Sequence, residues 1–127
     1  MKRLFILAVA TIITGCATWT AEQKTLGGTS VVLDVIDYAQ TKRCLSMPNC
    51  HETNTRLGEH PSNEKLAVFK AATSVAKLGL AEAVPKATAW LGVPESPMRT
   101  SVLLIFNFIQ FKTDVRNAKI VGIKWGF

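Results

Sequence analysis

The chain has 127 residues, 48% of them hydrophobic, and a net charge of +6. This length suits one domain with a modest core. The basic residues are scattered along the sequence rather than gathered into a stripe, which favours an ordinary solvated surface. A mild positive charge suits anionic head groups, lipopolysaccharide or cell-wall polymer.

The first fifteen residues have the pattern of a cleaved signal peptide. Lys2 and Arg3 precede an apolar run at 4–13 that only Thr11 interrupts. A spanning helix needs roughly 20 apolar residues, whereas this shorter run is typical of a signal peptide. The residues at 13–16, Ile-Thr-Gly-Cys, match the lipobox of bacterial lipoproteins. We therefore predict cleavage before Cys16 and acylation of its thiol. The alternatives are an ordinary secretory signal and a transmembrane helix.

The residue after the cysteine indicates the membrane. An aspartate there usually retains lipoproteins of this class at the inner membrane, and this chain has Ala17. We therefore predict an outer-membrane protein that faces the periplasm. Its expected partners are membrane lipid, through acylated Cys16, and an envelope protein. Without the signal peptide the net charge is about +4, and an exported chain seldom meets nucleic acid.

The cysteines also fit an oxidising compartment. If lipid occupies Cys16, Cys44 and Cys50 remain as an even pair around Pro48-Asn49, which favours a turn. A disulfide between them closes a short loop, for which the chain-entropy estimate is roughly 2–2.5 kcal/mol. Two free thiols are the alternative. Metal binding is less favoured, because structural zinc sites recruit four ligands at closer spacing.

The predicted fold is all-α, a small bundle of about three helices at 30–127. Residues 16–29 are expected to form a lipidated tether. Gly27-Gly28 indicates a flexible joint there, although Thr20 followed by Gln23 is compatible with a capping box.

A first helix is predicted from residue 29 to about 45. Its apolar side chains fall on two neighbouring faces at helical spacing, namely Val32, Ile36 and Ala39 beside Val31, Val35 and Tyr38. Its polar side chains make one stripe, which consists of Asp34, Asp37, Gln40 and Thr41.

Residues 46–63 lack apolar periodicity and are expected to form a loop. Pro61-Ser62-Asn63 then indicates the start of a second helix at 63–83. Its predicted apolar stripe contains Leu66, Phe69, Thr73, Ala76 and Leu80, with Lys70 and Lys77 on another face. Three prolines at 84–97 predict a connecting loop or one short helical turn.

The most apolar segment after the signal peptide is 101–111, between Arg99 and Lys112. It is too short to span a bilayer and contains Asn107 and Gln110, so we predict a buried core helix. A membrane-embedded or interfacial helix is the alternative. The tail at 120–127 is expected to be a short strand or an irregular end.

One polar cluster is a candidate site. It combines the stripe on the first helix with loop residues, and its members are Asp34, Asp37, Gln40, Thr41, Glu52, Asn54 and His60. Two carboxylates near histidines could bind a metal or act as acid and base, in which case Asp34, Asp37, His51 and His60 would form a metal-dependent enzyme site.

The structural interpretation of this cluster is favoured. No His-Glu-x-x-His motif or nucleophile elbow is present, so no catalytic residue, metal or cofactor is expected. Buried polar groups need partners, and a loop folded over the stripe would satisfy both sides. We therefore expect Glu52, Asn54 and His60 to hydrogen-bond back to the stripe.

A resemblance arises at the same residues. The segments 37–41 (Asp-Tyr-Ala-Gln-Thr), 52–54 (Glu-Thr-Asn) and 57–62 (Leu-Gly-Glu-His-Pro-Ser) resemble a group of small uncharacterised lipoproteins and membrane proteins of bacteria and their phages. The resemblance covers roughly 20–118 and departs at Thr55, where the group usually has proline. It implies a helical, membrane-associated fold and a phage or prophage origin.

The expected function is therefore a non-enzymatic structural or interaction role in the cell envelope, performed by a lipid-anchored helical protein. A lysis-module outer-membrane lipoprotein is one alternative, although such chains are usually short and proline-rich. The metal-dependent enzyme is the other.

Overall fold

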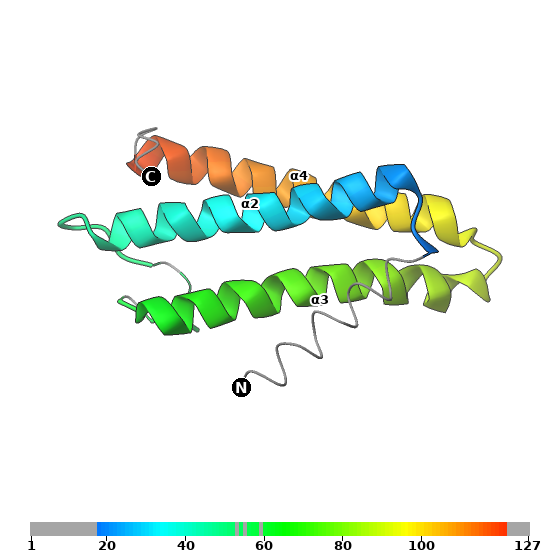
Figure 1. Cartoon of the computed structure of the whole chain (residues 1–127), viewed down its shortest axis with the longest axis horizontal. Helices are drawn as coiled ribbons and strands as arrows, with labels where there is room; N and C mark the ends of the chain where they lie inside the picture. Colours follow the sequence, from blue (N-terminus) through cyan, green and yellow to red (C-terminus); the bar gives the residue numbers. More distant parts are fainter. Residues whose placement is uncertain (1–17, 53, 55, 59, 122–127) are drawn as a thin grey trace.

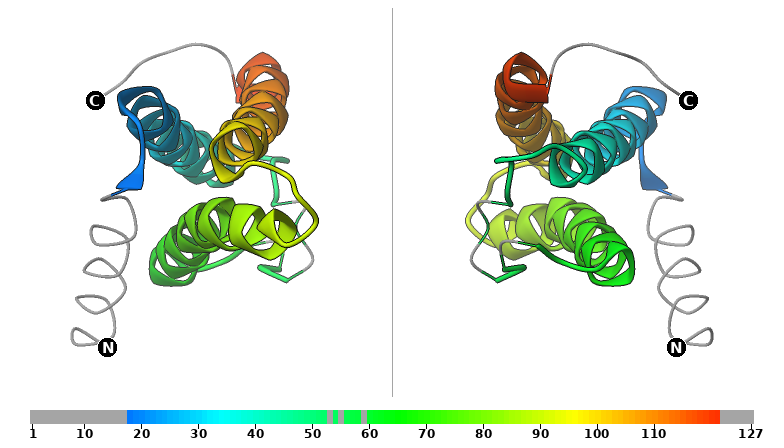
Figure 2. Two further views of the ribbon diagram at one scale, coloured as in Figure 1. Left: turned by 90° about the vertical axis from the view of Figure 1, so that its right-hand side faces the viewer. Right: turned by 90° about the vertical axis from the view of Figure 1, so that its left-hand side faces the viewer.

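The computed structural model describes residues 18–52, 54, 56–58 and 60–121. In this part of the chain three long helices form one bundle: α2 (Ala21–Leu45), α3 (Asn63–Ala89) and α4 (Glu95–Val121) (Figure 1). α2 and α4 run side by side in the same direction, and α3 packs against both in the opposite direction (Figure 2). The prediction of a small all-α bundle is confirmed. The predicted signal peptide, Cys16 and residues 122–127 of the tail lie outside the described residues.

α2 begins earlier than the sequence pattern predicts. The Thr20 hydroxyl accepts a hydrogen bond from the Gln23 backbone N–H, and the Gln23 side chain accepts one from the Thr20 N–H (both 3.2 Å). This reciprocal cap confirms the capping box and starts the helix at Ala21. The prediction of a tether through residue 29, with a joint at Gly27-Gly28, is therefore wrong, because both glycines lie inside α2.

Gly27 has a packing role that explains its place in a helix. A Cβ at this position would lie 2.7 Å from Cζ3 of Trp19 and 3.6 Å from Cδ2 of Leu78. The missing side chain therefore lets the Trp19 ring lie directly on the backbone of α2. A Cβ at Gly28 would have nothing within 4 Å. Of the two glycines, therefore, only Gly27 is required by the packing.

Local contacts fix the points at which the helices end and begin. Cys44 and Cys50 form the predicted disulfide, with Cα atoms 5.3 Å apart, just where α2 ends. Ser62 caps α3 by accepting a hydrogen bond from the Lys65 N–H (3.2 Å). α3 continues through Pro85 to Ala89, so the loop predicted for 84–97 shrinks to a turn at 90–94. Pro85 is fully buried, and this packing compensates for the hydrogen bond that proline cannot donate.

The polarity of the bundle is inverted in its middle. On α4, Asn107 and Asp114 are 9% and 5% exposed, whereas Phe108 is 69% exposed. The prediction of a buried core helix at 101–111 is therefore wrong for most of its apolar side chains. Five of them, each at least half exposed, are called here the outer apolar face: Leu104, Ile105, Phe108, Ile109 and Phe111. Within the described ranges no helix is long and apolar enough to cross a membrane.

α2 shows the same inversion. Asp34 and Asp37 are buried, while Val32 and Val35 are exposed by more than half. The predicted stripes of this helix are thus present, but the polar stripe faces inward.

A small apolar core lies at the end of the bundle where α2 begins. It consists of Trp19, Leu78, Ala81 and Leu103. The Trp19 indole N–H donates to Oε2 of Glu82 (2.8 Å), and the Arg99 guanidinium lies 3.3 Å from the same oxygen. Burial alone would raise the pKa of Glu82, but hydrogen bonds from Lys86 and Trp19 and the charge of Arg99 outweigh it and lower the pKa. Trp19 is thereby fixed to both α3 and α4.

The two adjacent glycines give a matched test of this packing. Gly27→Ala forces a Cβ into the held Trp19 ring, which typically costs about 1–3 kcal/mol. Gly28→Ala meets no neighbour and should stabilise the helix by roughly 0.5–1 kcal/mol. We expect Gly27→Ala to be the less stable variant by about 2 kcal/mol in urea unfolding. Equal stability of the two variants would contradict the close packing of Trp19 on α2.

Candidate functional site

The buried polar side chains of α2 recur at alternating steps of four and three residues. Such a repeat keeps one face of a helix toward its neighbours, as apolar residues do in a coiled coil. On α2 the positions of this repeat are Gln23, Gly27, Ser30, Asp34, Asp37 and Thr41. α2 therefore presents a mostly polar seam to α3 and α4.

Asp34 links α2 to α3 directly, and Lys77 extends the contact to α4. Asp34 forms an ion pair with Lys77 and accepts a hydrogen bond from the Ser74 hydroxyl, both on α3. Lys77 also donates to Oε1 of Gln110 on α4 (2.9 Å). The Asp34 and Lys77 side chains are 7% and 14% exposed, so their charges are largely removed from water and each needs the other.

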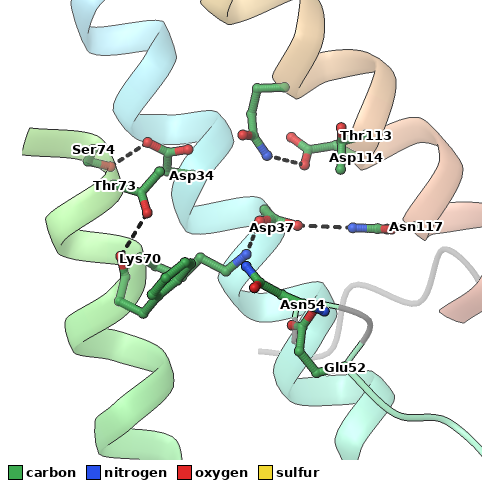
Figure 3. Close-up of polar contacts among 12 residues, drawn as sticks. Asp34, Asp37, Glu52, Asn54, Lys70, Thr73, Ser74, Thr113, Asp114 and Asn117 are labelled. Carbon is green, nitrogen blue, oxygen red and sulfur yellow. Dashed lines mark hydrogen bonds and ion pairs between the residues drawn. The ribbon is translucent and has the colours of Figure 1, made fainter. Parts of the chain in front are cut away.

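Asp37 makes a second three-helix contact, one turn further along α2. Lys70 of α3 forms an ion pair with one carboxylate oxygen, and the Asn117 amide of α4 donates to the other (2.9 Å) (Figure 3). Each aspartate of the stripe thus pairs with one lysine of α3. Asp34 takes its second partner, Ser74, from α3 as well, whereas Asp37 takes its second partner, Asn117, from α4.

Asp114 on α4 is the least satisfied member of this network. Oδ1 accepts a hydrogen bond from the Gln110 amide (3.0 Å), but Oδ2 is buried with no hydrogen-bond partner. The Gln40 amide of α2 donates to the Asp114 backbone carbonyl (3.1 Å), and its own Oε1 is likewise buried and without a partner. Two unpaired acceptors therefore lie at the same α2–α4 contact.

Charge in the network explains the behaviour of Asp114. Burial raises its pKa to about 6, and the nearby negative charges of Asp37 and Asp34 act in the same direction. Lys70 and Lys77 balance only two of these three carboxylates. The proton that the surroundings favour on Asp114 removes the excess negative charge. It also supplies a donor where only acceptors are present.

The sequence identified part of this network. The structure brings Asp34, Asp37, Gln40 and Thr41 together on the buried face of α2, but Asp37 and Gln40 take the partners described here from α3 and α4. The loop does not supply them: Glu52 accepts a hydrogen bond from the backbone N–H of Asn54 (2.9 Å). The prediction of loop partners for Asp37 and Gln40 is therefore wrong.

The two histidines do not join the aspartates. His51 and His60 are exposed, and His60 lines a shallow surface pocket with Lys42 and Ser46. Over the described ranges, no three His, Cys, Asp or Glu residues are placed to hold a metal ion. The metal-site arrangement considered for Asp34, Asp37, His51 and His60 is thus not assembled there.

Six members of the network were not recognised as such from the sequence: Lys70, Ser74, Lys77, Gln110, Asp114 and Asn117. The sequence pattern had placed the two lysines on a face away from the apolar stripe. One signal was present, since Lys70 and Lys77 are seven residues apart and thus match the seven-residue repeat of the buried positions on α2.

The arrangement holds charges in pairs and offers no exposed nucleophile or acid–base couple. Its chemistry is that of a buried, hydrogen-bonded connector between three helices. No protein-family model matches the chain, and no curated protein or solved structure matches it either.

A double-mutant cycle tests the central ion pair. Removing one partner of a buried pair leaves the other charge uncompensated, and we expect Asp34→Leu or Lys77→Met alone to lower the free energy of unfolding by about 3–5 kcal/mol. The double variant should lose much less than the sum of the two, because no unpaired charge remains. Additive losses in chemical denaturation would show that the pair is not coupled.

The raised pKa of Asp114 predicts a specific pH dependence. Between pH 3.8 and about 6 the folded chain holds a proton at Asp114 that the unfolded chain has lost. The stability of the wild type relative to Asp114→Asn should therefore fall as the pH rises through this window. At pH 7 the variant should be the more stable, by up to about 3 kcal/mol. A difference in melting temperature that stays constant from pH 3 to pH 7 would refute this assignment.

Proposed function

We propose that this chain is a lipid-anchored, membrane-associated helical protein of the cell envelope with a non-enzymatic, structural or interaction role. The observation that carries the proposal is the inverted polarity of the bundle. Its middle holds paired charges inside and large apolar side chains outside, which is the distribution that an apolar surrounding favours.

The outer apolar face is the surface that lipid would cover. Five neighbouring apolar side chains, 50–69% exposed, gather on one side of α4, and a contiguous patch of this kind marks an interaction surface. Covering it would contribute on the order of 5 kcal/mol. Further along α4, the exposed Lys112, Arg116 and Lys119 provide positive charge for anionic head groups.

The anchor supports lipid as the occupant of this face. Three peptide units separate Cys16 from Trp19, and a fully extended chain of that length reaches about 11 Å. Trp19 is fixed to Glu82 and Arg99. An acylated Cys16 would therefore hold the bundle at the bilayer surface. The anchor would raise the effective concentration of lipid at α4.

In this setting the buried network has a structural role. Because many large apolar side chains of α2 and α4 face outward, polar contacts between the helices specify their arrangement. Asp34–Lys77 and Asp37–Lys70 each link α2 to α3, and amides on α4 complete both contacts. These contacts would keep the bundle in one register while its outside faces lipid.

Fractionation and intact mass of the wild type and Cys16→Ala test the proposal. We expect the wild type in the outer membrane as an acylated chain that begins at Cys16, and we expect the variant to lose that mass and that location. The double variant Cys44→Ser/Cys50→Ser is the matched control, because it removes two thiols without touching the lipobox and should stay acylated. A wild type without acyl mass at Cys16 would refute the lipid anchor.

The same fractionation distinguishes membrane binding by α4 from membrane binding by the lipid on Cys16. If Cys16→Ala remains membrane-bound, adding Phe108→Asn and Ile109→Asn should release it, since both side chains belong to the outer apolar face. Retention after all three changes would mean that this face does not contact lipid.

A further inference from the structure

The turn between α3 and α4 exposes two large apolar side chains. Trp90 is 80% exposed and Leu91 is 63% exposed. The backbone of the turn is ordered: the Leu91 N–H donates to the Thr88 carbonyl (3.0 Å) and the Gly92 N–H to the Ala89 carbonyl (2.9 Å). Gly92 has a φ of +80°, a conformation that glycine adopts without strain. The exposure is therefore a feature of the folded turn.

The turn lies at the end of the bundle where α2 begins (Figure 1). The Trp19 indole is bound to Glu82 on α3, and eight helical residues from Glu82 to Trp90 advance about 12 Å along the axis. The three peptide units that link Cys16 to Trp19 can span at most about 11 Å. The exposed turn thus lies about two helical turns from Glu82, which binds Trp19, and an anchor at Cys16 would be tied to the same Trp19 by a short link.

We propose that the Trp90-Leu91 turn enters the boundary between head groups and acyl chains of the same leaflet that holds the lipid on Cys16. The inference rests on the proposed function and adds a second membrane contact to it. A tryptophan suits this boundary, because its large ring is apolar while its indole N–H can still bind water or head groups. Leu91 adds apolar area directly beside it.

The short anchor decides which end of the bundle meets the leaflet. α2 extends for 25 residues, or about 37 Å, away from Trp19. With a linker of about 11 Å, the far end and its disulfide loop could approach the membrane only if the bundle lay along the surface, whereas the near end stays close to the leaflet in any orientation. The end with the Trp90-Leu91 turn is the one that the linker holds near the surface.

The turn also continues directly into α4. The outer apolar face begins at Leu104, nine residues after the first residue of α4 and therefore about 14 Å along its axis. A bundle that lies on α4 would place this face and the turn on one leaflet together. The two contacts would then restrict the tilt of the molecule more than a flexible lipid link can.

Quenching by brominated lipid tests the inference on the full, acylated protein. The wild type and Trp90→Phe are reconstituted into vesicles of phosphatidylethanolamine and phosphatidylglycerol, with bromine either near the head groups or near the chain ends. The difference between the two proteins isolates Trp90 from the other tryptophans. We expect shallow bromines to quench this difference signal by more than half, and deep bromines to quench it less.

Each outcome decides one point. An acylated, membrane-bound wild type whose Trp90 signal is not quenched overturns this inference and leaves the proposed function standing. A blue shift that grows with protein concentration without quenching would show that a second copy of the chain covers the turn, which also overturns it. Absence of acyl mass at Cys16 refutes the proposed function itself, and the mass measurement on the same sample distinguishes that failure.

Discussion

The ion pair between Asp34 and Lys77 is the constraint on which the arrangement of the helices depends. Its two charges lie where bundles ordinarily place apolar side chains, so each must meet its partner in the folded state. The pair joins α2 to α3, and Gln110 brings α4 to the same point. Asp37 and Lys70 repeat this contact one turn further on. A slip of one helix against another would leave buried charges unpaired, so the register of the bundle follows from these contacts.

The apolar exterior of the bundle follows from its polar interior. Because α2 and α4 turn polar side chains inward, residues such as Val35 and Phe108 are left outside. In water this distribution exposes apolar area that folding would normally remove. Beside a bilayer it is favourable, and the short link from Cys16 to Trp19 would keep the molecule there. Under the proposed function, the polar interior and the apolar exterior are thus two consequences of the same environment.

The end of the bundle near Trp19 is built differently from its middle. There the core is apolar, and Glu82 and Arg99 hold the Trp19 indole against it. This contact fixes where the chain enters the fold. The position of Trp19 in turn determines which part of the surface an anchor at Cys16 could bring to lipid. The exposed turn at Trp90 lies at the same end of the bundle as Trp19.

Local patterns in the sequence determined the helical class, the cap at Thr20, the disulfide of Cys44 and Cys50, and the polar stripe through Asp34 and Asp37. Each depends on residues a few positions apart, which the sequence displays directly. Which face of α2 is buried was decided only by the tertiary structure, because the partners of the stripe lie 33 to 80 residues away. Helical periodicity shows that two faces differ, but not which one turns inward. That choice depends on Lys70, Lys77 and Asn117 reaching the same seam, and so it appears only when the three helices are together.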